Sequence, residues 1–168
     1  DPDLIYSVGM RRALFALACC SLLASVPGAA ERLGYPASEF IARRKALGQA
    51  LGSGTALMFG STMPLNGIRF RQDNDFYYLT GNTDVNAVLV MDAATADAWL
   101  FLPAQGAREI RSDGKNWLSQ GDQAKAWGFA GIQPLSELTE FLERRRGGFG
   151  QQVLWTRLPR TALLGGLG

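Results

Sequence analysis

The sequence predicts an α/β domain, a single domain with a mixed sheet flanked by helices. Short apolar segments typical of strands alternate with segments whose apolar residues recur at helical spacing. The 168 residues, 47% of them hydrophobic and 19% charged, suit one globular domain. No internal repeat, low-complexity tract or inner domain boundary interrupts this pattern.

The first predicted elements are a helix and a buried strand. Apolar residues recur at helical spacing over residues 39–51, which predicts a helix that Gly52 ends. Residues 55–59 (TALMF) are apolar and lie between glycines, which favours a strand. We expect a turn over residues 64–67. The basic residues of the helix are expected to face outward, namely Arg43, Arg44 and Lys45.

The middle of the chain predicts a short helix and two paired strands. Asn74 can cap a helix over residues 75–79, and Gly81 can close it in the left-handed conformation. The apolar runs at residues 87–91 (AVLVM) and 98–102 (AWLFL) are separated by a turn of small and polar residues. This spacing favours a strand pair.

The last predicted elements are helices around residues 122–127 and 136–145 and a strand over residues 153–155. The segment from residue 158 resolves into no element, and we interpret the domain as truncated at its C-terminal end.

Two tryptophans lie within apolar runs and are expected in the core, namely Trp99 and Trp155. The other two have more polar neighbours and are expected to be partly exposed, namely Trp117 and Trp127. A further aromatic cluster could serve as a platform for bases, but no basic residue is interleaved with it, so we favour core packing for Phe76, Tyr77 and Tyr78.

Residues 10–30 have the order of a secretory signal peptide: two arginines, a mostly apolar run and small residues before a cleavage site. A membrane span needs about 20 apolar residues, and this run is shorter and is stopped by Pro27 and Gly28. We therefore favour a signal over a span or a core helix, with acylation of Cys19 or Cys20 as a minor alternative. Export would make the protein secreted or periplasmic.

The signal divides the chain into three parts. Residues 1–9 are interpreted as an upstream flank, residues 10–30 as the signal peptide and residues 31–168 as the mature domain. Both cysteines fall within the predicted signal, so we expect neither a disulfide nor a thiolate site in the mature domain.

Charge and residue types exclude several classes of function. The net charge of +2 comes from basic and acidic residues spread along the chain, which argues against a nucleic-acid partner. The sequence has no histidine, so a histidine-based triad or histidine-bearing metal centre is excluded within it. Asp73 and Asp75 could suggest a metal site, but an isolated DxD pair more often forms turns and helix caps.

Residues 70–81, FRQDNDFYYLTG, carry the most specific motif. They resemble the FRQ-x-S/N-DF-x-YLTG signature of the N-terminal domain of aminopeptidase P enzymes, in the creatinase and prolidase superfamily. Supporting segments follow in the family's order: EFIARR at residues 39–44, DVNAVLVM at 84–91, LFLP at 100–103 and Arg108-Glu109. The resemblance covers roughly residues 38–155.

The resemblance implies a two-part Xaa-Pro aminopeptidase, which removes an N-terminal residue that precedes proline. In the family the N-terminal domain helps to build a homo-oligomer and edges the substrate cleft. Two divalent ions, manganese or a related metal, activate water in a following pita-bread catalytic domain. The resemblance thus implies no catalytic residue and no metal ligand in this chain, and partners that are its own catalytic domain and proline-containing peptides.

The same resemblance suggests residues for the frame of the cleft. Arg71 offers a fork for a carboxylate, either Asp75 or one across a domain interface, and we favour Asp75. Family members often place an aromatic residue soon after the glutamate that Glu109 matches, and Trp117 is the candidate replacement. The motif and interface candidates are Arg71, Asp73, Asp75, Tyr77, Tyr78, Glu109, Arg111 and Trp117.

Two alternatives remain at this level. One is a stand-alone interaction module or pseudo-enzyme subunit with the same fold. The other is a relative of creatinase or prolidase, which we disfavour because their N-terminal domains lack so close a copy of the FRQ and YLTG elements.

Overall fold

The computed structural model describes residues 31–32, 34–64, 69–146 and 153–157. The predicted signal peptide, residues 65–67 of the predicted turn and the segment from residue 158 lie outside this part of the chain.

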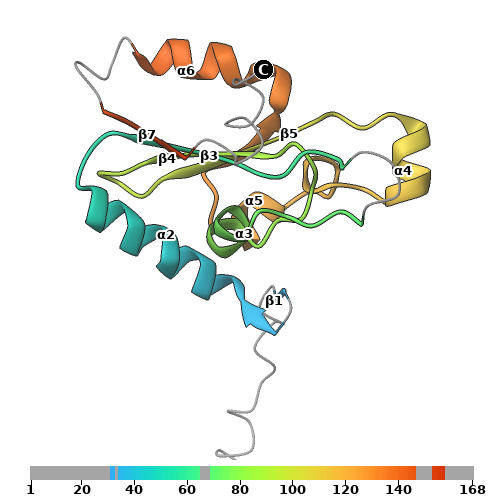
Figure 1. Cartoon of the computed structure of the whole chain (residues 1–168), viewed down its shortest axis with the longest axis horizontal. Helices are drawn as coiled ribbons and strands as arrows, with labels where there is room; N and C mark the ends of the chain where they lie inside the picture. The colour runs from blue at the N-terminus through green and yellow to red at the C-terminus, as the bar shows by residue number, and fades with distance from the viewer. Residues whose placement is uncertain (1–30, 33, 65–68, 147–152, 158–168) are drawn as a thin grey trace, which may run out of the picture.

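A five-stranded mixed sheet forms the centre of the described structure, in the order β6-β5-β4-β3-β7 (Figure 1). β3 (Thr55–Phe59), β4 (Val88–Asp92) and β5 (Ala98–Leu102) pair antiparallel. β6 (Gly131–Pro134) lies parallel to β5, and β7 (Leu154–Arg157) lies parallel to β3. The predicted α/β class with a mixed sheet is therefore confirmed.

Helices cover both faces of this sheet (Figure 1). α2 (Ala37–Leu51), α3 (Asn74–Thr80) and α5 (Gln123–Ala126) lie on one face, and α6 (Leu138–Arg146) lies on the other. α4 (Ala107–Asp113) lies at one end of the molecule. The remaining short elements are β1 (Glu31–Arg32), β2 (Tyr35–Pro36) and the 3-10 helices η2 (Trp117–Ser119) and η3 (Leu135–Glu137).

The central strands fill two cores because successive side chains of a strand point to opposite faces. Leu89, Met91 and Leu100 belong to the larger core, on the side of α2 and α3. Val90 and Phe101 belong to the smaller core, with Phe141 of α6. A strand that is buried on both faces has a nearly continuous apolar sequence, and this is why residues 87–91 and 98–102 were recognisable as strands.

Several elements were not predicted, and the longest of them are β6 and α4. β6 has the sequence GIQP and pairs with β5. Its glycine, glutamine and proline are not typical strand residues, so the sequence gives no strand signal there. α4 has the sequence AREIRSD, lies at the surface and buries no residue, so it has no apolar periodicity to reveal it. α2 begins at Ala37, two residues before the predicted start.

Three of the four tryptophan predictions were wrong, and only Trp99 packs against a core as predicted. Trp117 and Trp127 are buried, with 4% and 3% of their surfaces exposed. Trp155 is 41% exposed and Trp99 is only partly buried. β7 is an edge strand, so the apolar run around Trp155 has no neighbour on one side. The rings of Trp117 and Trp127 stack on each other with centroids 4.9 Å apart, and this contact is not visible in either residue's local sequence.

Candidate functional site

The segment at residues 70–81 is anchored by Gln72. Its side-chain Oε1 accepts hydrogen bonds from the backbone N–H of Ser61 (2.6 Å) and of Asp73 (2.9 Å), and its Nε2 donates to the carbonyl of Asp84 (2.9 Å). One amide therefore joins the loop after β3, the start of α3 and the loop before β4. A side chain at Gly60 would meet the Gln72 amide oxygen at 3.0 Å, so glycine permits this close approach.

Asp73 begins helix α3. Its Oδ1 accepts from the backbone N–H groups of Asp75 (3.0 Å) and Phe76 (2.9 Å), which places the cap one residue earlier than the predicted Asn74. This geometry supports the turn-and-cap interpretation of the DxD pair. Gly81 ends the helix in the left-handed conformation, as predicted, and its N–H donates to the Tyr77 carbonyl at 2.8 Å.

Arg44 fixes α3 against α2 from inside the protein, and the prediction that it faces outward was wrong. Only 1% of its surface is exposed. Its guanidinium donates to the carbonyls of Leu79 (2.9 Å), Trp127 (2.6 Å) and Gly128 (3.1 Å) and lies 4.3 Å from the centre of the Phe129 ring. Burial lowers its pKa to about 10, and the group remains charged at neutral pH.

A signal for this burial exists in the sequence. Arg44 shares one helical face with Ala37, Phe40 and Gly48, all of which are buried. Gly48 faces the backbone of Ala93, where a Cβ would come within 2.8 Å of the carbonyl oxygen. Residue type alone suggested exposure, whereas spacing along the helix indicated the core.

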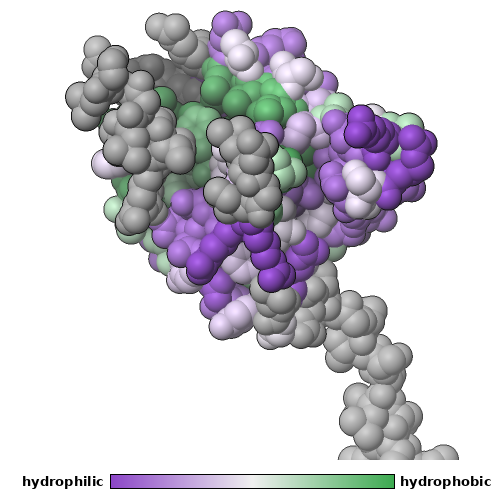
Figure 2. Space-filling model, turned by 45° about the vertical axis from the view of Figure 1, so that its right-hand side comes forward, coloured by the Kyte–Doolittle hydropathy of each residue, from purple (hydrophilic) through white to green (hydrophobic). Residues whose placement is uncertain are grey.

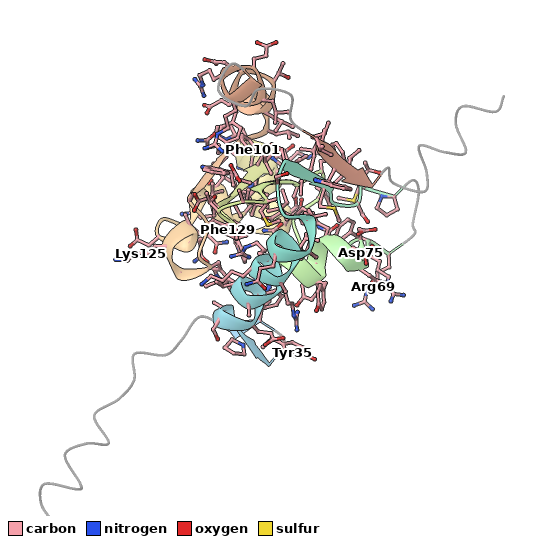
Figure 3. The ribbon with its side chains drawn as sticks, turned by 90° about the vertical axis from the view of Figure 1, so that its left-hand side faces the viewer. Tyr35, Arg69, Asp75, Phe101, Lys125 and Phe129 are labelled. Carbon is pink, nitrogen blue, oxygen red and sulfur yellow. The ribbon has the colours of Figure 1, made fainter. Side chains whose placement is uncertain are left out.

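A pocket of about 650 Å³ lies where β3 ends, β4 begins and α6 starts. The chain that leads into α3 contributes Arg69, Arg71 and Asp73 to its lining. Figure 3 shows Arg69 and Asp75 on the same side of the molecule, away from Lys125. The other lining residues come from the strand ends and the start of α6: Phe59, Gly60, Ser61, Thr62, Pro64, Asn86, Ala87, Val88, Leu135 and Leu138.

The pocket brings together two of the eight candidate residues, Arg71 and Asp73. Arg71 is exposed, and no hydrogen bond or ion pair joins it to another residue within the described ranges. The expected pairing of Arg71 with Asp75 is therefore not formed in this structure, and an exposed ion pair would add little stability. Asp75 has contacts of its own.

The other candidates lie elsewhere. Tyr77 packs edge-on against Phe40, with ring centroids 6.1 Å apart, whereas Tyr78 is 54% exposed and so does not pack in the core. Glu109 and Arg111 lie on α4, where the Glu109 carboxylate accepts from the backbone N–H of Gly106. The hydrophilic lobe at the right of Figure 2 corresponds to this helix, and hydrophobic surface gathers in the upper part of the same view.

Tyr78 belongs to an exposed cluster with a cation at its centre. The Arg43 guanidinium lies 4.3 Å from the ring centre of Tyr78 and 5.0 Å from that of Tyr35. Arg43 also donates to the Glu39 carboxylate (3.1 Å) and to the Tyr78 carbonyl (3.2 Å). Its hydrogen-bonding groups are thus occupied within the chain, so the cluster fastens α2 to α3.

Neither a metal-binding group nor a membrane-spanning helix occurs within the described ranges. These residues contain no group of three or more histidine, cysteine, aspartate or glutamate side chains that could hold a metal ion. No helix among them is both long enough and apolar enough to span a membrane.

Comparison with known proteins places the chain in a family. The model of the family described as "Aminopeptidase P, N-terminal domain" matches residues 40–154. No curated protein matches the chain by sequence.

Solved structures agree with this match. Escherichia coli aminopeptidase P in its low-pH form aligns with a TM-score of 0.55 and 26% identity over 65% of this chain and 26% of its own. Pseudomonas aeruginosa aminopeptidase PepP aligns with a TM-score of 0.63 and 24% identity over 80% of this chain and 31% of its own. Icp55 from Saccharomyces cerevisiae shares the fold, with a TM-score of 0.57 and 17% identity over 67% of this chain and 28% of its own.

The chain thus spans about a quarter to a third of the length of these structures. The family match covers more than half of the chain and includes the motif at residues 70–81, strands β3 to β6 and the pocket lining. This protein belongs to the aminopeptidase P N-terminal domain family.

Proposed function

We propose that this chain is the non-catalytic N-terminal domain of a Xaa-Pro aminopeptidase and that it edges the substrate cleft and contributes to a homo-oligomer. The family match over residues 40–154 is the observation that carries the proposal. The motif is consistent with a framing role, because Gln72 and Asp73 use their side chains to position the loops around the pocket.

The described residues do not fit the two-metal centre that the family resemblance implies. They offer no group of three metal-binding side chains, and the whole sequence lacks histidine. We therefore assign the metal-dependent step, with manganese or a related divalent ion, to a catalytic domain outside this sequence. Within this chain we assign no residue to the chemical step.

An activity assay tests whether the chemical step requires the catalytic domain. The 168-residue chain should release no N-terminal residue from an X-Pro peptide in the presence of manganese. The same chain joined to the catalytic domain of its own gene product should do so, and a chelator should abolish the reaction. Turnover by the 168-residue chain that persists through purification would contradict the proposal, and sedimentation of the joined protein would test the homo-oligomer.

We also propose that residues 10–30 direct export of the protein. The support is the order of charged, apolar and small residues in that segment. Fusion of residues 10–30 to a phosphatase that folds only outside the cytoplasm should give active, processed reporter. Replacement of Arg11 and Arg12 by glutamate should reduce export, and equal export by the two fusions would count against the signal.

A further inference from the structure

We infer that the pocket between β3, β4 and α6 binds the C-terminal carboxylate of a short peptide that ends in an apolar residue. The inference concerns binding by this chain alone, needs no catalytic domain and so goes beyond the proposed function.

The cationic side of the pocket is formed by Arg69 and Arg71. Both side chains are exposed, and neither has a hydrogen-bond or ion-pair partner among the residues that the structure describes. Asp73 also lines the pocket, but its Oδ1 already accepts two backbone N–H groups of α3. Two guanidinium groups beside one carboxylate leave a net positive charge, which suits an incoming carboxylate.

The apolar side lies on the strand ends and the start of α6. Phe59 of β3 and Val88 of β4 line it together with Leu135 and Leu138. Phe59, Leu135 and Leu138 are only partly buried, so they retain apolar surface that a ligand can cover. A volume of about 650 Å³ is within the range of pockets that hold small ligands.

The floor of the pocket is fixed before any ligand arrives. Gly60 N–H donates to the Ala87 carbonyl at 2.8 Å, and Asn86 N–H donates to the Ser61 carbonyl at 3.0 Å. Asn86 adopts a positive φ of 55° to make this connection. Gln72 holds the Ser61 N–H from the other side at 2.6 Å. A preformed site spends little of its binding free energy on ordering the protein.

A peptide fits this lining better than an acyl chain does. Ser61, Thr62 and Asn86 place polar side chains next to the apolar residues, whereas an acyl chain would leave such groups without hydrogen-bond partners. The amide groups of a peptide can supply those partners.

A C-terminal carboxylate fits better than an aspartate or glutamate side chain. In the last residue of a peptide the carboxylate, the side chain and the amide N–H are all attached to one carbon, so the three groups reach a single small pocket together. In an extended chain, by contrast, neighbouring side chains point to opposite sides. A side-chain carboxylate would therefore enter the pocket without an adjacent apolar group.

Titration calorimetry on the 168-residue chain tests the inference with four probes: N-acetyl-Ala-Ala-Leu, its C-terminal amide, N-acetyl-Ala-Ala-Gly and octanoate. The free acid ending in leucine should bind with a Kd of about 0.1 to 1 mM at low salt. The amide should bind at least about tenfold more weakly because it lacks the charge. The glycine peptide and octanoate should also bind more weakly.

Variants locate the site. Arg69→Gln and Arg71→Gln should each weaken binding of the free acid by about tenfold. Arg108→Gln, an exposed arginine of α4 outside the pocket, should leave the Kd unchanged within about twofold. Thermal unfolding of each variant checks that the exposed substitutions leave the fold intact.

Three outcomes would overturn the inference: equal binding of the acid and the amide, tighter binding of octanoate than of the peptide, or no binding of the acid at about 10 mM. None of these depends on X-Pro cleavage, so failure here and failure of the proposed function are distinguishable.

Discussion

Arg44 shows how a charged side chain can be almost as enclosed as the apolar residues of its helix. Burial lowers the pKa of its guanidinium to about 10, because removal from water disfavours the charged form. Its three hydrogen bonds to carbonyl oxygens, each worth about 1.5 to 3 kcal/mol for a charged donor, act against that cost.

We predict that Arg44→Met lowers the free energy of unfolding by about 2 kcal/mol or more, because the carbonyls of Leu79, Trp127 and Gly128 lose their donor while staying buried. Lys45→Met, on the exposed side of the same helix, should change it by less than about 0.5 kcal/mol. Urea denaturation of both variants measures the difference, and equal stability would mean that the Arg44 contacts contribute nothing net.

Tyr77 differs from Arg44 because its buried polar group makes no hydrogen bond. The hydroxyl is enclosed, and no hydrogen-bond partner for it exists within the described ranges. We predict that Tyr77→Phe is neutral or raises the free energy of unfolding by up to about 1 kcal/mol, because it removes a polar group that burial penalises. Tyr78→Phe serves as the exposed control. A loss of more than about 1 kcal/mol in Tyr77→Phe would show that the hydroxyl has a partner.

At the scale of elements, the connection from α3 to the larger core depends on Gly81. Its φ is +65°, and a Cβ there would meet Trp127 at 3.0 Å and Phe40 at 3.1 Å. Backbone strain and overlap with buried rings therefore act together at this position.

We predict that Gly81→Ala destabilises the protein by about 2 to 4 kcal/mol. Gly121→Ala is the matched control, because Gly121 has a φ of +70° and nothing within 4 Å of its Cβ position. The control should lose only about 1 kcal/mol, from backbone strain alone. Thermal unfolding of the two variants separates backbone strain from overlap with the buried rings. Equal losses of stability in both variants would show that the contact with the rings is unimportant.

The elements that were predictable are those that local sequence features mark. The continuous apolar runs of β4 and β5, the helical spacing in α2 and the glycine after α3 each follow from local rules. β6 could not be found in this way, because its strand conformation depends on pairing with β5.

The candidate site was likewise predictable only where local sequence determines it. The cap of α3 was predictable to within one residue, because the sequence favoured Asn74 and the structure uses Asp73. The pocket was not predictable, because it joins the loop after β3 to α6 across more than 70 positions of the chain. Arg69 had no local feature that distinguished it, and its role arises from where the fold places it.

At the scale of the whole molecule, one sheet supports two cores. Leu89 and Val90 are neighbours in sequence but lie in different cores, so neither core can lose its packing without disturbing the same strand.

We predict a single cooperative unfolding transition in which both faces of the sheet melt together. Leu89→Ala and Val90→Ala should each lower the urea midpoint, and far-UV circular dichroism and tryptophan fluorescence should give coincident curves. Trp99 reports on the core with α6, whereas Trp117 and Trp127 report on the other core. Separate midpoints for variants that retain only one set of tryptophans would contradict this coupling.

The stacked indoles of Trp117 and Trp127 have an optical consequence. Two rings held 4.9 Å apart at an interplanar angle of 30° couple their electronic transitions. The coupling adds a pair of bands of opposite sign to the circular dichroism spectrum, in the region used to estimate helix content. This signal belongs to tertiary structure, so it provides an intrinsic probe of how the 3-10 helix η2 and the end of α5 come together, without any added label.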